Sequence, residues 1–271
     1  MRPWGHMCGM SQPLIAHLET RAVIGVAGPD AKSFLNGLLS QEIETLAPGE
    51  LRFSGLLTPQ GRLLYDLFVA ETPEGALLDV AAEHRDAILA RLTMYKLRAK
   101  VALAASELAV FAAWPATAGD FADPRLPALG SRAYAADRTT TATEDDYEAH
   151  RLALGVPGPA DWGTDKLYPI DADFDLLAGI DFKKGCFVGQ ETTSRMKRRG
   201  TIKNRMLPIT FDGPAPAFGA EVLAGELRAG EVLSGRDGRA MALLRLDRIE
   251  GAELTVDGRA VRVDRPGWLP A

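Results

Sequence analysis

The sequence is poor in the side chains that form disulfides and metal sites. It contains two cysteines and four histidines among 271 residues. Two cysteines are too few for a disulfide framework, so a reducing and therefore cytoplasmic location is expected. Cys8 lies in an N-terminal stretch without pattern, whereas Cys186 lies between glycines and lysines. The histidines show no metal-ligand spacing, so no stable metal site is predicted.

The sequence also lacks long apolar runs and an excess of positive charge. No apolar segment approaches the roughly 18–20 residues that a membrane-spanning helix needs. Residues 1–10 lack the apolar centre of a signal peptide, and no membrane partner is expected. The net charge is −5. Bulk electrostatics therefore do not favour nucleic acid, and direct nucleic-acid binding is not expected. Any anion-binding function must be local.

What the sequence does have is an ordinary globular composition, with 46% hydrophobic and 25% charged residues. This length suffices for two or three small domains. Residues 21–27 predict a strand that Gly28 ends. Asp30 follows as an N-cap, and the apolar spacing from there to about Gln41 predicts a short amphipathic helix.

A compact α+β unit is predicted from about residue 46 to residue 111. It has the order strand, strand, strand, helix, strand, and residues 58–61 form a turn between the first two strands. The predicted elements are strands at 51–57, 62–70 and 76–81, a helix at 83–96, and one or two strands at 101–111.

The rest of the chain divides into a mixed segment and an all-β segment. Residues 156–173 are rich in Gly, Pro and Asp and predict a long loop that is functional or mobile. From residue 204 onward, short strands separated by glycines predict a small barrel or sandwich. The other predicted elements are a loop at 114–127, a strand at 132–137, and helices at 147–154 and 190–199.

The segment DFKKGCFVGQE around Cys186 is the most informative stretch. A cysteine acts as nucleophile or metal ligand in its thiolate form. Lys183 and Lys184, together with the N-terminus of the helix that follows, favour this form. Gly185 and Gly189 leave room for another molecule to approach the sulfur. The alternative is a buried structural cysteine, and the residues alone leave both interpretations open.

Two further features have both a structural and a functional interpretation. Asp66 lies in an apolar strand on the same face as Leu64 and Phe68, so it either faces a polar cavity or marks the wetter face of the sheet. A basic cluster at the end of the 190–199 helix is either a solvated face or an anion site for a polyglutamate tail, a phosphate or RNA. The cluster consists of Arg195, Lys197, Arg198, Arg199, Lys203 and Arg205.

The segment from Lys184 to Glu191 closely resembles the K-G-C-[YF]-x-G-Q-E motif of the YgfZ family. That family is related in fold to the T-protein of the glycine cleavage system, an aminomethyltransferase. The resemblance extends from about residue 20 and includes the stretches LLTPQGRLLYD, YKLR and RLALGVP. It is greatest to the mitochondrial and alphaproteobacterial branch, whose members support maturation of 4Fe–4S proteins.

The resemblance implies an α+β fold of the T-protein type in three parts. The first, folate-binding domain would be discontinuous, at 10–45 and 105–200. A ferredoxin-like α+β unit would be inserted at 46–104, and a small all-β barrel would occupy 201–271.

The resemblance also implies a ligand, a chemistry and partners. The ligand would be tetrahydrofolate or a one-carbon derivative. Cys186 would be the essential thiol, which holds a transient iron–sulfur cluster or receives a group, and Asp66 would lie beside the folate. The partners would be iron–sulfur scaffold or carrier proteins and 4Fe–4S client enzymes. The residues so assigned to cofactor binding are Tyr65, Asp66, Arg151, Lys184, Gln190, Glu191 and Arg195.

Two alternatives to an accessory factor for iron–sulfur assembly or repair stay open. One is a folate-dependent aminomethyltransferase, although the chain departs from that family where Tyr65 replaces the first of two acids and Ala153 replaces another. The other is a tRNA-modification factor that contacts RNA through residues 195–205, which would require steep salt dependence.

Overall fold

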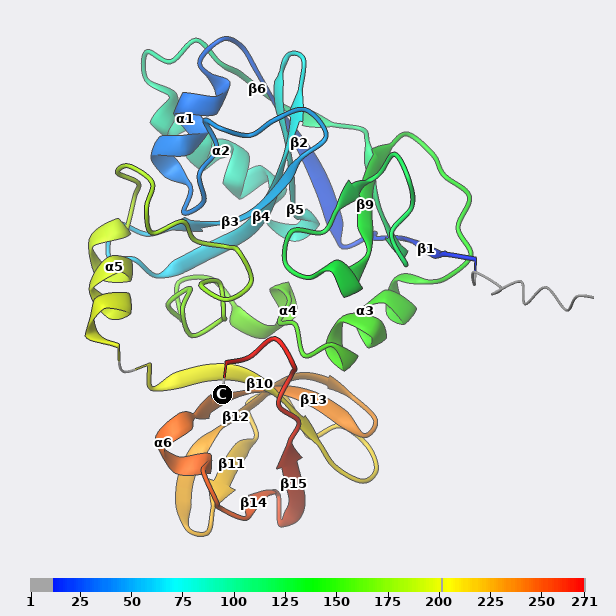
Figure 1. Cartoon of the computed structure of the whole chain (residues 1–271), viewed down its shortest axis with the longest axis vertical. Coiled ribbons are helices and arrows are strands. Elements are labelled where there is room, and N and C mark those ends of the chain that lie inside the picture. Colours follow the sequence, from blue (N-terminus) through cyan, green and yellow to red (C-terminus); the bar gives the residue numbers. More distant parts are fainter. Residues whose placement is uncertain (1–11, 201, 271) are drawn as a thin grey trace, which may run out of the picture.

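The computed structural model describes residues 12–200 and 202–270. Within them, the strands form three sheets, of which one is a closed barrel. Figure 1 shows the barrel at one end of the molecule and a helix-covered sheet at the other, with the remaining segments between them. No helix in these residues is both long and apolar enough to cross a membrane.

The largest open sheet has the strand order β3-β4-β5-β2-β6, and every neighbouring pair is antiparallel. Helices α1 and α2 pack on one face, where Leu35, Ile88 and Leu92 join the apolar side chains of the sheet in one buried core. The elements are β2 Arg21–Ala27, α1 Ala31–Leu38, β3 Leu51–Leu57, β4 Leu63–Thr72, β5 Gly75–Ala81, η1 Ala82–His84, α2 Arg85–Lys96 and β6 Ala102–Ser106.

This unit has the ferredoxin-like order, with β3 added at one edge. Its first strand is β2, because β2 pairs with β5 on one side and with β6 on the other. The sheet thus takes an interior strand, β2, from the segment 10–45, and its edge strand β6 extends to both sides of residue 104. The predicted boundaries at 46 and 104 therefore cut through a continuous hydrogen-bonded sheet.

A second sheet, β1-β7-β9-β8, packs beside the first. Its elements are β1 Leu14–His17, β7 Ala109–Trp114, β8 Phe121–Ala122, η2 Pro127–Leu129 and β9 Ser131–Ala135. Helix α3 Glu144–Ala153 follows and begins earlier than predicted, because Thr143 and Asp146 form a capping box. The segment predicted as loop at 114–127 contains the short strand β8, which pairs with β9.

The stretch at 156–173 is not a loose loop. It contains α4 Pro159–Trp162, and the turns after it bury Ile170 and Phe174 completely. Phe174 packs against Phe53 of β3, with 4.6 Å between ring centroids. Apolar side chains hidden among Gly, Pro and Asp residues thus make this stretch part of the core that joins the two sheets to the barrel.

The C-terminal region forms a closed six-stranded barrel in the order β10-β13-β12-β11-β14-β15. This resolves the choice between barrel and sandwich. Its interior is filled by apolar side chains such as Leu207, Val232 and Ala242. The elements are β10 Asn204–Thr210, β11 Glu221–Ala224, β12 Leu227–Arg236, β13 Arg239–Arg245, α6 Leu246–Ile249, β14 Leu254–Val256 and β15 Arg259–Val263.

Candidate functional site

Cys186 is exposed and carries a free thiol. It lies in a turn segment, residues 181–189, which we call the cysteine loop. This loop leads into α5 Gln190–Arg199, at the outer side of the molecule in Figure 1. The interpretation of Cys186 as a buried structural cysteine is therefore wrong. A second protein or a small molecule has direct access to the sulfur.

Lys184 fixes one side of the cysteine loop. Its side chain is buried, and the Nζ group donates hydrogen bonds to the carbonyl oxygens of Asn36, Leu39 and Gln41 at 2.8, 2.8 and 2.7 Å. These carbonyls lie at the C-terminal end of α1 and just beyond it, where a cation is favoured. Burial lowers the pKa of Lys184 to about 8. Lys184 thus serves as an anchor, with its ammonium group occupied by the backbone.

Glycine packing fixes the other side of the loop. Gly189 has a φ of +83°, and a Cβ atom there would lie 2.7 Å from the carbonyl oxygen of Thr58. Across the contact, a Cβ atom on Gly61 would lie 2.9 Å from Cβ of Thr192. The turn between β3 and β4 and the start of α5 therefore meet with no room for side chains. Phe187 is also buried and packs into an apolar core cluster, which anchors the loop further.

The start of α5 borders an open hollow beside the cysteine loop. Gln190 donates from Nε2 to the carbonyl oxygen of Gly185 at 3.3 Å, which ties the helix to the loop across Cys186. Gln190 and Glu191 line a hollow of about 490 Å³ together with Phe182. Arg195, one turn further along the helix, is exposed.

Asp66 lies in a different environment, between the two open sheets. It is 3% exposed, and its carboxylate accepts from Nη1 of Arg21 at 2.8 Å. Arg21 also donates to Asp79 at 2.6 Å, and Asp79 accepts from Arg132 at 2.6 Å. Asp66 therefore faces neither a solvent cavity nor a wet sheet face. Its charge is balanced by buried guanidinium groups.

We call this group the charge cluster; its members are Arg21, Asp66, Asp79, Asp123, Arg125 and Arg132. The cluster pairs three carboxylates with three guanidinium groups, all of them buried. Burial acts to raise the pKa of Asp123, but Arg125 and Arg132 outweigh it and lower that pKa. The Arg132 guanidinium lies over the Phe68 ring, 3.8 Å from its centroid. Such a network stabilises the packing of the two sheets only while every charge keeps its partner.

The remaining expected cofactor residues are also engaged inside the protein. Tyr65 is half-buried and packs against His84, with ring centroids 5.1 Å apart. The buried Arg151 donates from Nη2 to Glu148 at 2.6 Å and from Nη1 to Asp161 at 3.3 Å. Asp66 and Arg151 thus form ion pairs inside the protein, and their place beside a folate stays a prediction. The expected residues with accessible polar groups are Gln190, Glu191 and Arg195.

Of the basic cluster in α5 and after it, some members form ion pairs and others do not. Arg205 is buried and bonds Asp173 at 3.0 Å and Asp175 at 2.5 Å. Lys197 pairs with Asp175 at 3.4 Å. Arg199 and Lys203 instead border a cavity of about 670 Å³, which we call the basic cavity.

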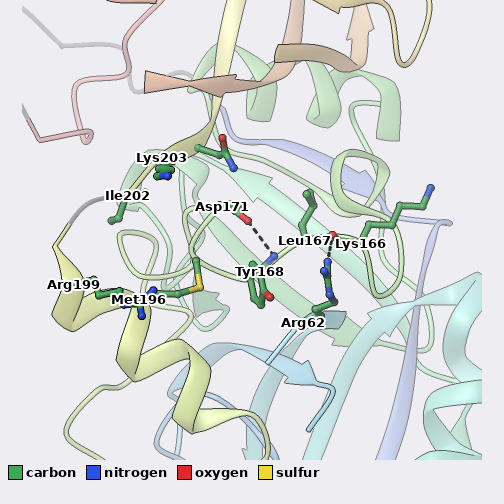
Figure 2. A pocket seen from close by; sticks show the side chains of 10 residues that line it. Arg62, Lys166, Leu167, Tyr168, Asp171, Met196, Arg199, Ile202 and Lys203 are labelled. Carbon is green, nitrogen blue, oxygen red and sulfur yellow. Dashed lines mark hydrogen bonds between the residues drawn. The ribbon is translucent and has the colours of Figure 1, made fainter. Parts of the chain in front are cut away.

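Figure 2 shows the basic cavity between the end of α5, the start of β4 and the start of β10. Arg62 and Lys166 add two further cations to its wall, and Tyr168 and Asp171 line it as well. Sequence reasoning missed Arg62, Lys166 and Tyr168 as site residues, because they lie in separate segments that only the fold brings together. The run of basic residues after α5 was the one signal that pointed to this region.

Metal-binding groups are sparse in the described part of the chain. There, no group of three or more His, Cys, Asp or Glu side chains is arranged to hold a metal ion. Cys8 lies outside the described residues.

Comparison with known proteins gives the relatives of this fold. The family described as the CAF17 C-terminal β-barrel domain matches residues 203–271. Over 95% of this chain and 86% of the other, the structure superposes on the glycine cleavage system aminomethyltransferase T from Bartonella henselae. The TM-score is 0.77 and the sequence identity is 18%. The T-protein-like fold with a C-terminal barrel is thereby confirmed, and at this identity the likeness concerns the fold alone.

Proteins related in sequence identify the family more specifically than the fold does. The chain is 31% identical to the mitochondrial iron-sulfur cluster assembly factor IBA57 of Mus musculus, over 93% of this chain and 84% of that protein. It is 30% identical to the Homo sapiens protein of that name, over 86% and 78%. The Neurospora crassa homolog is 30% identical over 81% of this chain, which spans 58% of that longer protein.

The names of these relatives place them in mitochondria. This contradicts the expected cytoplasmic location. The expectation was wrong because a low cysteine count bears on redox conditions and does not distinguish one reducing compartment from another. Over most of its length, with its T-protein-like fold and C-terminal barrel, the chain belongs to the IBA57 family of iron–sulfur cluster assembly factors.

Proposed function

We propose that this protein is an accessory factor for the assembly or repair of 4Fe–4S proteins and that Cys186 is its acting group. The names of its relatives support the assembly role. The observation that carries the role of Cys186 is its exposure between buried anchors, Lys184 on one side and Phe187 on the other. The proposal extends to the YgfZ-type motif, which would serve to hold one thiol outward.

The proposed chemistry requires a partner protein. An iron–sulfur cluster is typically held by four protein ligands, mostly cysteines. In the described residues, Cys186 is the free cysteine, and no group of three His, Cys, Asp or Glu side chains is placed to complete a site. Cys186 would therefore supply one ligand to a cluster that a scaffold, carrier or client protein holds with the others. The cluster is cargo in this scheme.

The surroundings of Cys186 suit such a contact. Gly185 and Lys183 beside it are exposed, and a Cβ atom on Gly185 would meet nothing within 4 Å. The open hollow along the start of α5 continues this accessible surface. A partner can approach the sulfur without any rearrangement of the loop.

We also propose tetrahydrofolate, or a one-carbon derivative, as a ligand. We propose no reaction step that involves it. Asp66 and Arg151 are paired internally, so the proposal places the ligand beside Gln190 and Glu191. Calorimetry with tetrahydrofolate tests it. Binding that Gln190→Ala weakens, and that the neighbouring exposed control Lys183→Ala leaves unchanged, would support this placement. No heat of binding to the folded protein would remove folate from the account.

The assembly role is tested by complementation. Cells that lack the gene are assayed for aconitase, as a 4Fe–4S enzyme, and for a cluster-independent enzyme. Wild type and Lys100→Ala, a change at an exposed lysine outside the cysteine loop, should restore the 4Fe–4S activity, whereas Cys186→Ala and Cys186→Ser should not. Restoration by Cys186→Ala would contradict a role for the thiol, and an unchanged 4Fe–4S activity in the deleted strain would contradict the assembly role itself.

A further inference from the structure

The basic cavity is enclosed by segments from three parts of the fold. Arg62 lies just before β4, and Lys166 and Tyr168 lie in the turns after α4. Arg199 is the last residue of α5, and Lys203 directly precedes β10. Figure 2 shows Arg62, Tyr168, Arg199 and Lys203 around one space, whereas the side chain of Lys166 extends away from it towards Gly163. The cavity volume of about 670 Å³ lies within the range of small-molecule sites.

The four cations of this cavity have no ion-pair partner in residues 12–200 and 202–270. This applies to Arg62, Lys166, Arg199 and Lys203, although twenty ion pairs occur elsewhere in the described chain. Their neighbours in sequence differ, because Lys197 and Arg205 both pair with Asp175. The lining of this one cavity therefore brings together several cations without an ion-pair partner.

Part of the cavity wall is already ordered. Arg62 donates from Nη1 to the carbonyl oxygen of Lys166 at 2.6 Å, and its guanidinium lies 5.0 Å from the centroid of the Tyr168 ring. These two contacts fix the plane of the guanidinium group. In the described structure its other side-chain N–H groups make no hydrogen bond, so they are free to bind the two oxygens of a carboxylate or phosphate.

One carboxylate shares the cavity but does not neutralise it. Asp171 is buried and accepts a hydrogen bond from the backbone N–H of Tyr168 at 3.2 Å. Burial raises the pKa of Asp171, although the hydrogen bond from Tyr168 and the charges of Arg205 and Arg62 act in the opposite direction. Arg62, Arg199 and Lys203 outnumber this one carboxylate, so the cavity is positive.

The cavity also has an apolar side. Leu167, Met196 and Ile202 line it beside the Tyr168 ring. A bare inorganic ion would leave this apolar surface uncovered, whereas an organic anion would cover it and pair with the cations. An RNA strand would need cations spread along an open face, and the protein as a whole carries a net charge of −5.

We infer that the basic cavity binds a small organic molecule with at least two carboxylate or phosphate groups, held by Arg62, Arg199 and Lys203. This site lies at the end of α5 remote from Cys186 and does not depend on the thiol chemistry. It goes beyond the assembly role, because it gives the protein a small-molecule ligand recognised by charge and shape.

The test is calorimetry on the full chain with three probes: citrate, pyrophosphate and a triglutamate peptide. The double variant Arg199→Gln/Lys203→Gln removes two cations from the cavity. The double variant Arg98→Gln/Lys100→Gln removes two exposed cations that line neither this cavity nor the hollow beside the cysteine loop, and it serves as the matched control. Circular dichroism melts of both variants establish that they fold.

We expect at least one probe to bind the wild type, and the cavity variant to weaken that binding by about tenfold or more. The control variant should weaken it by less than about threefold, through screened long-range charge only. A preference between citrate or triglutamate and pyrophosphate identifies the carboxylate or phosphate source. Absence of binding by all three probes, or equal weakening by both variants, would overturn the inference. So would a single-stranded RNA that binds at the cavity cations more tightly than the small anions.

Discussion

The cysteine loop and the charge cluster use polar side chains in opposite ways. In the cysteine loop, Cys186 is exposed, and the buried side chains of Lys184 and Phe187 hold the loop on either side of it. In the charge cluster, every polar side chain is buried, and each is paired with another. A protein that must present a thiol needs the first arrangement, and a pair of packed sheets that contain charges needs the second.

The comparison shows that an unusual polar residue in a sequence has no fixed meaning. The resemblance assigned both Asp66 and Lys184 to cofactor binding. In the structure, both side chains contact other groups inside the protein. The accessible group is Cys186, whose neighbours provide the anchoring. We therefore expect mutations in the charge cluster to lower stability and a mutation of Cys186 to affect function alone.

The largest effect is expected in the charge cluster. Asp79→Ala removes a fully buried carboxylate that contacts both Arg21 and Arg132 at 2.6 Å. It leaves two buried cations undercompensated and should lower the free energy of unfolding by about 3–5 kcal/mol, measured by urea denaturation. The control is Asp86→Ala, whose ion pair with Arg85 is on the surface. It should cost less than about 1 kcal/mol. Equal effects would mean that the cluster is not a stabilising unit.

An intermediate effect is expected where the cysteine loop meets the β3–β4 turn. Gly189→Ala places a Cβ atom 2.7 Å from the carbonyl oxygen of Thr58 at a φ of +83°. It should cost about 1–3 kcal/mol of unfolding free energy and displace the loop, with loss of complementation. Gly185→Ala is the matched control, because its Cβ atom would meet nothing within 4 Å. It should change the unfolding free energy by less than about 0.5 kcal/mol. If the two variants behave alike, the loop is not held by this contact.

A smaller effect concerns the Lys184 anchor and pH. The pKa of Lys184 is lowered by burial to about 8, below its unfolded value, so between these values the unfolded chain binds more protons than the folded one. The penalty for burying the ammonium group is complete below pH 8 and disappears as the pH rises towards about 10.4. The stability of wild type relative to Lys184→Met should therefore increase over this range in urea denaturation. A decrease would show that the three carbonyl contacts outweigh burial.

Local signals in the sequence predicted many elements well. The strands at 21–27 and 51–57 and the helix at 190–199 have the predicted bounds, because apolar periodicity and terminal Gly or Pro residues define them locally. The barrel followed from short strands between glycines, and its closure is confirmed. The resemblance to T-protein supplied the fold class, and the fold comparison confirms it.

What the sequence could not provide are contacts between distant segments. Lys184 binds carbonyls 143 to 148 residues away, and Asp66 pairs with Arg21 at a separation of 45 residues. Neither pairing has a local pattern. The basic cavity similarly assembles Arg62, Lys166 and Lys203 from separate segments. Chemistry-bearing residues were thus visible in the sequence, but whether they face solvent or a partner depends on packing.

Cys186 is exposed and is proposed to act on a partner, so its side chain should contribute little to the stability of the fold. The most direct measurement is the free energy of unfolding of Cys186→Ala by urea denaturation, on protein that fails to restore the 4Fe–4S enzyme. We predict a value within about 0.5 kcal/mol of wild type, as for an exposed side chain. A loss of about 2 kcal/mol or more, as for a packed apolar residue, would contradict the account and make Cys186 part of the core.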